Sequence, residues 1–331
     1  MVVDAQLGSY GDLLFGSALA VYVLAMILHA VEYALSRNLA PVEEDARVPV
    51  AAGAGSSSDP AGTTGTTATT DTDAPRPPRS RAERYGRTGV SLTVLGFGLH
   101  LAMLVVRGLA AERVPWGNMY EFSAAVCLVA VGAWLVVLYR RPELRRLGAF
   151  VLLPVIVLMF LAGTVLYTQT APVVPALRSY WLAIHVTAAV IASGILLLAG
   201  VASVLYLLRR VHDGNPARFA WTARLPGADA LDRTAYRATA IAFPIWTFAV
   251  ITGAIWAEAA WGRYWGWDPK ETTAFIAWIV YACYLHARST AGWRGRPAAT
   301  INVIGFAVMV FNLFFVNIVV TGLHSYAGLP G

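Results

Sequence analysis

The stretch "LAIHVTAAVIASGILLLAGVASVLYLL", residues 182–208, contains no Asp, Glu, Lys or Arg. At about 1.5 Å per residue, a helix of this length extends about 40 Å, which exceeds the roughly 30 Å hydrocarbon core of a bilayer. Charge-free apolar runs of this length are typical of transmembrane helices. The chain has 331 residues, of which 57% are hydrophobic and only 13% are charged. The sequence therefore predicts an all-α polytopic membrane protein and argues against a soluble domain.

The same pattern recurs along the chain and predicts about eight transmembrane helices. Their predicted ranges are 12–35, 89–110, 119–139, 147–167, 182–208, 240–260, 270–287 and 300–322. Between the first two ranges lies a segment rich in Ala, Gly, Ser, Thr and Pro, which has too little apolar surface to fold. We therefore expect an N-terminal transmembrane helix in 1–36, a cytoplasmic and largely disordered linker in 37–88, and a membrane domain in 89–326.

The positive charges alternate between the two sides of the predicted bundle. Most of the 25 Lys and Arg residues lie in or beside the segments 36–88, 140–146, 209–237 and 287–296. Because cytoplasmic loops carry an excess of Lys and Arg, both termini are predicted to be extracytoplasmic. The net charge of +6 then reflects the cytoplasmic loops and requires no nucleic-acid partner. The few cationic residues on the other side are Arg107, Arg113, Arg178, Arg263 and Lys270.

Four of the six histidines form two pairs at two depths in the membrane. His185 and His324 lie at the predicted outer face, whereas His100 and His286 lie deeper, in the second and seventh predicted spans. Ionisable groups within a membrane are costly and usually face a cavity or a partner. Two bis-imidazole sites suit the axial positions of haem, because zinc usually adds a third or fourth protein ligand. The alternative, that each histidine only forms hydrogen bonds between helices, stays open at this point.

The segment "WGRYWGWDPKE", residues 261–271, places three tryptophans and a tyrosine within seven residues. An aromatic belt at a membrane interface is usually less dense. Asp268 is predicted to cap the following helix, with Pro269 at its first position and Glu271 completing a capping box. Lys270 is the only lysine among 25 cationic residues, which suggests a specific need for a compact ammonium group, although chance is an equal alternative.

The longer segment "WGRYWGWDPKETTAFIAWIVYACYLH" closely resembles the tryptophan-rich WWD signature of haem-handling membrane proteins. Within that superfamily the sequence is similar to the CcsA/ResC family of system II cytochrome c biogenesis. Three further stretches extend the likeness over most of 89–326, namely "VPWGNMYEF", "LRSYWLAIHV" and "GLHSY". The first span and the linker lie outside it.

The resemblance implies a role for most of the residues singled out above. His185 and His324 would ligate haem at an outer site, and His100 and His286 would hold haem within the membrane. The residues that would lie against the outer haem are Trp261, Trp265, Trp267 and Asp268. The haem propionates would need positive partners, and the cationic residues on the predicted outer side are the candidates, with interfacial snorkelling an equal alternative for each: Arg107, Arg113, Arg178, Arg263 and Lys270.

The resemblance also implies a function. The protein would relay haem b across the bacterial cytoplasmic membrane and present it on the extracytoplasmic face for attachment to the CxxCH motif of apocytochrome c. It would act as a holocytochrome c synthase (haem lyase) within a complex that contains a ResB-type protein. This agrees with the short extracytoplasmic loops, none of which could fold as a domain. Cys127 and Cys283 form no CxxC pair, so thioredoxin-like proteins would reduce the apocytochrome.

Two alternatives of other classes stay open. A bis-histidine di-haem electron-transfer protein would use the same four histidines and retain its haem permanently. A transporter for another substrate would need polar groups along a path, for which Asn302, Asn312 and Asn317 are the only indication.

Overall fold

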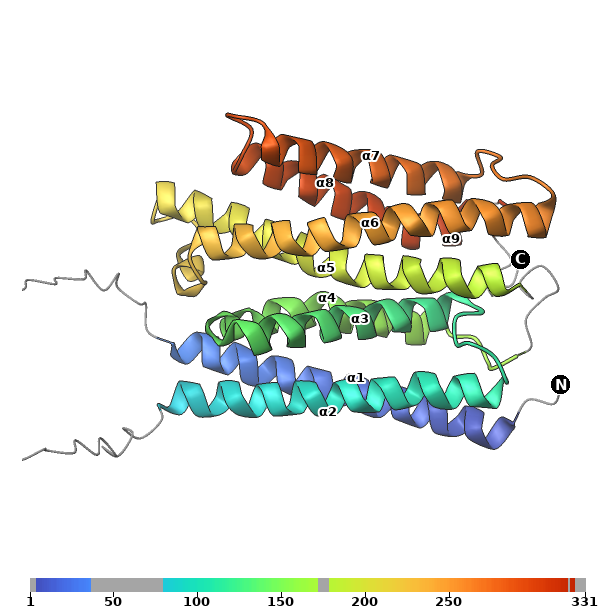
Figure 1. Ribbon diagram of the computed structural model, residues 1–331. Helices are drawn as coiled ribbons and strands as arrows, with labels where there is room; N and C mark the ends of the chain where they lie inside the picture. Colours follow the sequence, from blue (N-terminus) through green and yellow to red (C-terminus); the bar gives the residue numbers. More distant parts are fainter. Residues whose placement is uncertain (1–3, 37–79, 172–178, 321, 325–331) are drawn as a thin grey trace, which may run out of the picture.

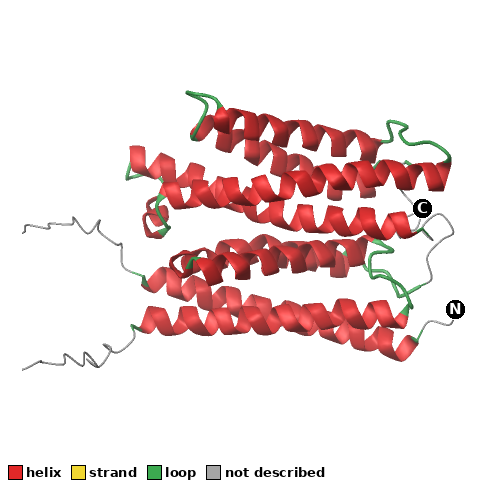
Figure 2. Ribbon diagram, in the orientation of Figure 1, coloured by secondary structure: helices red, strands yellow, loops and turns green. Residues whose placement is uncertain are grey.

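The computed structural model describes residues 4–36, 80–171, 179–320 and 322–324. All regular structure within these residues is helical, and Figure 2 shows no strand among them. The predicted all-α class is confirmed.

Eight long helices and three short ones make up the regular structure of the described residues. The long helices are α1 (Ala5–Leu35), α2 (Arg81–Ala110), α3 (Met119–Arg140), α4 (Gly148–Thr164), α5 (Tyr180–Gly214), α6 (Ala228–Trp261), α7 (Pro269–Ser289) and α8 (Arg296–Leu313). The short ones are η1 (Pro142–Leu147), η3 (Ala220–Arg224) and α9 (Phe315–Ile318).

Seven helices within the described residues are long and apolar enough to cross a membrane. The predicted span 270–287 is not among them. It corresponds to α7, whose 21 residues carry Lys270 and Glu271 in the first turn and Arg288 in the last. Nevertheless, α7 packs against α8 and α6 and runs along the bundle beside them (Figure 1). The start of α1 and the short helix α9 therefore lie at the same end of the bundle (Figure 1).

The long helices pack in successive pairs across the bundle: α1 with α2, α3 with α4, α5 with α6, and α7 with α8 (Figure 1). Helix α5 is central because it packs against α3, α6 and α8. We call the end of the bundle at which α6 ends and α7 begins the motif end, since residues 261–271 lie there.

Helices α1, α2 and α6 begin well before the ranges that hydropathy predicts, at Ala5, Arg81 and Ala228. Capping side chains set the first turns of α1 and α2. The Asp4 side chain accepts hydrogen bonds from the backbone N–H groups of Gln6 and Leu7, so α1 begins at Ala5. The Ser80 side chain accepts from the N–H of Glu83, so α2 begins at Arg81. Residues 81–88, predicted to belong to the linker, are therefore helical; residues 37–79 of the linker lie outside the described residues.

Buried charges join α1, α2 and α3 at the motif end. Arg107 is only 1% exposed and lies 3.2 Å from Asp12 and 3.4 Å from Glu121, measured between guanidinium nitrogens and carboxylate oxygens. Arg113 lies 2.7 Å from the other oxygen of Glu121. The fully buried Glu121 carboxylate thus compensates two guanidinium groups.

We expect Glu121→Gln to destabilise the bundle by about 3–5 kcal/mol, because removing one partner of a buried ion pair leaves uncompensated charge. Thermal unfolding in detergent, followed by circular dichroism, measures this. The matched control is Glu143→Gln, which removes an exposed pair with Arg141 and should cost about 0–1 kcal/mol. Equal effects of the two substitutions would contradict the structural role of Glu121.

Candidate functional site

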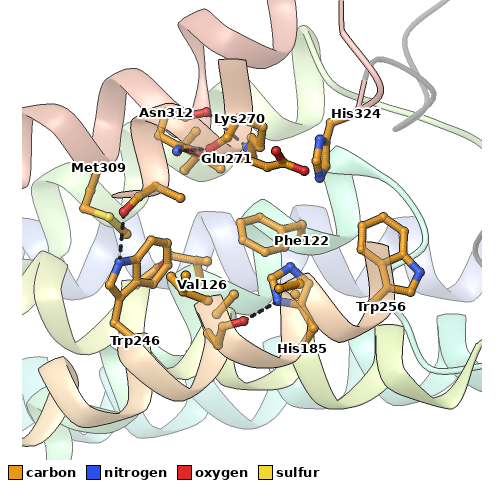
Figure 3. Close-up of a pocket in the computed structure, with 18 of the residues that line it drawn as sticks. Phe122, Val126, His185, Trp246, Trp256, Lys270, Glu271, Met309, Asn312 and His324 are labelled. Atoms are coloured by element: carbon orange, nitrogen blue, oxygen red, sulfur yellow. Dashed lines mark hydrogen bonds between the residues drawn. The ribbon is translucent and has the colours of Figure 1, made fainter. Parts of the chain in front are cut away.

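A pocket opens at the motif end between the α5–α6 pair and the α7–α8 pair, with α3 contributing to its wall (Figure 3). Its empty space, including the part open to the surroundings, is about 1070 Å³. The lining is mainly aromatic and aliphatic. Apart from tyrosine and tryptophan, the polar side chains of the lining are His185, Ser193, Lys270, Glu271, Asn312 and His324.

Two imidazoles project into this pocket from opposite walls, His185 from α5 and His324 from the chain after α9 (Figure 3). Nδ1 of His185 lies 2.8 Å from the carbonyl oxygen of Ala249. Because a carbonyl oxygen only accepts hydrogen bonds, Nδ1 of His185 is the donor, and Nε2 is the basic nitrogen of the neutral ring. Nδ1 of His324 lies 2.9 Å from the Oδ2 atom of Asp268, a carboxylate acceptor that favours the same tautomer.

Aromatic rings surround both imidazoles. The Trp256 ring stacks on the His185 ring, with centroids 6.0 Å apart and an interplanar angle of 7°. It also meets the His324 ring edge-on at 5.8 Å. Trp261 contacts His324 at 5.1 Å and Trp256 at 4.8 Å between centroids. The site therefore presents two imidazoles within broad aromatic surface.

Asp268 has two roles in the structure. It caps α7, and the predicted capping box is confirmed, because Glu271 accepts a hydrogen bond from the Asp268 N–H at 3.1 Å. Its carboxylate also accepts from the Leu323 N–H at 2.7 Å and contacts His324. Burial alone would raise the pKa of Asp268, but the hydrogen bonds from His324 and Leu323 outweigh it and lower that pKa below its ordinary value.

Two glycines leave room for these contacts. A Cβ atom at Gly253 of α6 would lie 2.7 Å from Cε1 of His185. A Cβ atom at Gly322 would lie 2.6 Å from Oδ1 of Asp268. Since real Cβ atoms do not approach other heavy atoms this closely, the positions of the His185 ring and the Asp268 carboxylate depend on glycine.

Comparison with known proteins places this pocket in a family. A family model described as "Cytochrome C assembly protein" matches residues 116–324. The chain belongs to the cytochrome c assembly protein family. The matched residues include both pocket imidazoles and the whole of 261–271.

The chain is also similar to proteins named cytochrome c biogenesis protein CcsA, so the predicted resemblance is confirmed. The relative from Chlamydomonas reinhardtii is 42% identical over 159 residues, which cover 48% of this chain and less than half, 44%, of the relative. The relative from Mesostigma viride is 33% identical over 248 residues, which cover 68% of this chain and 81% of the relative.

A solved structure, titled Cytochrome c Heme Lyase CcmF, has a similar fold. The TM-score is 0.58 at 17% sequence identity, and the match covers 95% of this chain and 47% of that chain. This chain therefore spans about half the length of that protein, and the likeness concerns the fold alone.

In this cytochrome c assembly protein, two of the three motif tryptophans line the pocket. Trp261 and Trp265 are lining residues. Trp267, predicted to lie against the same ligand, is not; it is 65% exposed and has a left-handed backbone with φ of 57°. Its ring packs edge-on against Trp265 and Phe275, at centroid distances of 5.7 and 6.2 Å. Trp256 was missed by sequence reasoning; the only signal was a further tryptophan five residues before the motif.

Of the predicted propionate partners, Lys270 lines the pocket. Arg107 and Arg113 do not fit that prediction, because their charges are compensated by carboxylates of α1 and α3. Arg263 is not a lining residue; its guanidinium lies over Gly266. Arg178 lies outside the described residues.

The structure does not bring His100 and His286 together. His100 is fully buried on α2, with its Nδ1 atom 3.5 Å from the Tyr22 hydroxyl of α1. His286 is exposed on α7, on the opposite side of the bundle (Figure 1). Neither residue lines the pocket. Similar depth in the membrane does not determine which neighbour a helix faces, and α2 packs against α1 and α3, whereas α7 packs against α8 and α6.

Proposed function

We propose that this protein binds haem b in the pocket at the motif end and presents it for covalent attachment to the cysteines of a CxxCH apocytochrome c. His185 and His324 would be the axial ligands of the iron. The observation that carries the proposal is their arrangement on opposite walls, each with Nδ1 held by an oxygen acceptor. Histidines that bind metals usually have this second contact, which fixes the tautomer and the ring orientation.

The donor set supports haem over a bare metal ion. No group of three or more His, Cys, Asp or Glu side chains suited to a metal occurs among the described residues. Zinc sites usually need three or four protein ligands, whereas haem iron needs only the two axial ones. The flat surfaces of Trp256, Trp261 and Trp265 suit the faces and edges of a planar macrocycle.

The work of the chain in this reaction would be positioning. Each apocytochrome thiol adds across one vinyl group, so that a carbon–sulfur bond forms, the vinyl double bond is lost, and the thiol hydrogen passes to the other vinyl carbon. The addition needs no net oxidation or reduction. Two fixed imidazoles would hold the iron, and the aromatic wall would hold the ring while the thiols approach.

The further elements of the proposal follow the family resemblance and the charge pattern. Haem would reach the pocket by relay across the bacterial cytoplasmic membrane, and the pocket would face the extracytoplasmic side. A ResB-type membrane protein would complete the haem lyase and help to hold the apocytochrome, and thioredoxin-like reductants would keep its cysteines reduced. A relay through His100 and His286 stays a prediction, to be tested by haem content after His100→Gly and His286→Gly, with and without added imidazole.

Absorption spectra of the purified protein, oxidised and reduced, test the proposal. We expect a low-spin bis-histidine haem spectrum, with sub-stoichiometric haem that is lost to apocytochrome c when the ResB-type partner is present. Complete and permanent occupancy would instead favour the electron-transfer alternative. A protein that neither contains haem nor takes it up would favour a transporter of another substrate.

A further inference from the structure

We infer that Lys270 binds the haem propionates and thereby orients the ring, with the propionate edge toward the middle of the bundle and the vinyl edge toward the motif end. This inference rests on the proposed function and adds the orientation of the substrate to it. The two edges of haem b are chemically different, since the propionates are anionic and the vinyl groups are apolar. A pocket with an asymmetric charge distribution therefore selects one orientation.

The cation lies on the inner side of the two imidazoles. In Figure 3, Lys270 and Asn312 lie on the wall opposite Trp246, on the side of the imidazoles that faces away from Trp256. Trp246 and Trp256 both belong to α6, and ten residues of helix separate them by about 15 Å. Since α6 ends at Trp261, the Trp256 side is the motif end, and the Lys270 ammonium group lies deeper in the bundle than the imidazoles.

The ammonium group is held in place but retains capacity for an anion. Its Nζ atom donates one hydrogen bond, to the carbonyl oxygen of Asn312 at 3.1 Å. The Asn312 side chain is fixed in turn by Thr273 Oγ1 at 2.7 Å and the Lys270 carbonyl oxygen at 3.2 Å. An ammonium group has three donors, and Lys270 makes no ion pair with the described residues. Two donors thus remain for carboxylate oxygens.

Two carboxylates lie beside the imidazoles, and Glu271 lies between Lys270 and His324 (Figure 3). The Glu271 carboxylate accepts from the N–H groups of Gly266 and Asp268, which places it beneath the motif loop. The Asp268 carboxylate contacts His324. A propionate near these two carboxylates would be repelled, whereas the apolar vinyl edge would not. Attraction at Lys270 and repulsion beside the imidazoles therefore favour the same orientation.

This orientation places the reacting groups at the motif end of the pocket. The vinyl edge would face the motif end, where an apocytochrome outside the bundle can reach it, and the propionates would be withdrawn from that surface. It also accounts for the single lysine of the sequence, because a flexible four-carbon stem can extend into the pocket from the first turn of α7.

A comparison of haem with its dimethyl ester, whose propionates carry no charge, tests the inference. Each ligand is titrated into detergent-solubilised protein, and binding is followed by Soret absorption. We expect the unmodified protein to prefer haem over the ester by about tenfold or more, as hydrogen bonds to a charged group allow. Lys270→Met should bind both ligands equally, and Lys270→Arg should retain part of the preference.

Arg263→Met is the matched control, because Arg263 is the described motif cation outside the pocket lining. It should keep the preference for haem. A loss of preference in Arg263→Met, or an unchanged preference in Lys270→Met, would overturn the inference. Circular dichroism checks that each variant is folded. Failure of the unmodified protein to bind either ligand would contradict the proposed function itself, whereas binding that depends on His185 and His324 but not on Lys270 would contradict only the orientation.

Discussion

Replacing His324 or His185 with alanine should change the haem spectrum from six-coordinate low-spin to five-coordinate and lower haem affinity by more than about a hundredfold. Loss of a partner behind a metal ligand typically costs about 10–100-fold in affinity, and loss of the ligand itself should cost more. Added imidazole should restore the low-spin spectrum, since it can occupy the empty axial position. Soret titration and reduced-minus-oxidised spectra measure both effects.

His212→Ala provides the matched control for this pair of variants. His212 lies on α5, like His185, but at the opposite end of the bundle, where its Nδ1 atom contacts the carbonyl oxygen of Arg218. Its replacement should leave the spectrum unchanged. An unaltered spectrum in both His185→Ala and His324→Ala would mean that the pocket histidines only form hydrogen bonds within the bundle.

Asp268→Asn should separate the two roles of that residue. Asparagine caps helices about as well as aspartate, so the unfolding temperature should change little. The negative acceptor beside His324 is lost, however, which should weaken haem binding by about 10–100-fold and raise the haem reduction potential, because a less basic imidazole stabilises the ferric state less. Asp268→Ala should lower the free energy of unfolding by about 0.5–2 kcal/mol more, because the N-cap of α7 is lost.

The control for Asp268→Asn is Asp4→Asn, which alters the N-cap of α1, a residue that does not line the pocket. The direction of the Asp268 pKa adds a condition on pH. Because the pKa of Asp268 is lowered in the folded protein, the contact between its carboxylate and His324 is fully present at pH values above the ordinary aspartate pKa of about 3.9. This contact is lost only as the pH falls through the lower pKa of the folded protein. If the Asp268→Asn variant has normal haem affinity and a normal haem reduction potential, then Asp268 only caps α7.

The sequence could predict the features that depend on local composition. Charge-free runs located the seven apolar helices, and the Asp-Pro-Lys-Glu order located the start of α7. Hydropathy also predicted a span at the position of α7, although Lys270, Glu271 and Arg288 at its ends leave it outside the seven helices that are long and apolar enough to cross a membrane. His185 and His324 could be grouped from the sequence because both residues lie near helix ends at the same end of the bundle.

The features that depend on how helices face one another could not be predicted in the same way. Depth along a helix says nothing about rotation around it, so His100 and His286 were paired although their helices lie on opposite sides of the bundle. Arg107 pairs with Asp12 of α1 and Glu121 of α3, and these partners became evident only from the packing of the helices. Trp267 was grouped with Trp265 by proximity in sequence, but its left-handed backbone turns it away from the pocket.

The distribution of the two imidazoles along the chain has a consequence for biosynthesis. His185 lies in the middle of the chain, whereas His324 follows α9, and its hydrogen-bonding partner Asp268 directly precedes α7. If His185 and His324 are the axial ligands, the second one is missing until the ribosome has produced residue 324. A nascent chain that has already inserted α5 and α6 would then offer only one ligand and would hold haem more weakly than the finished protein.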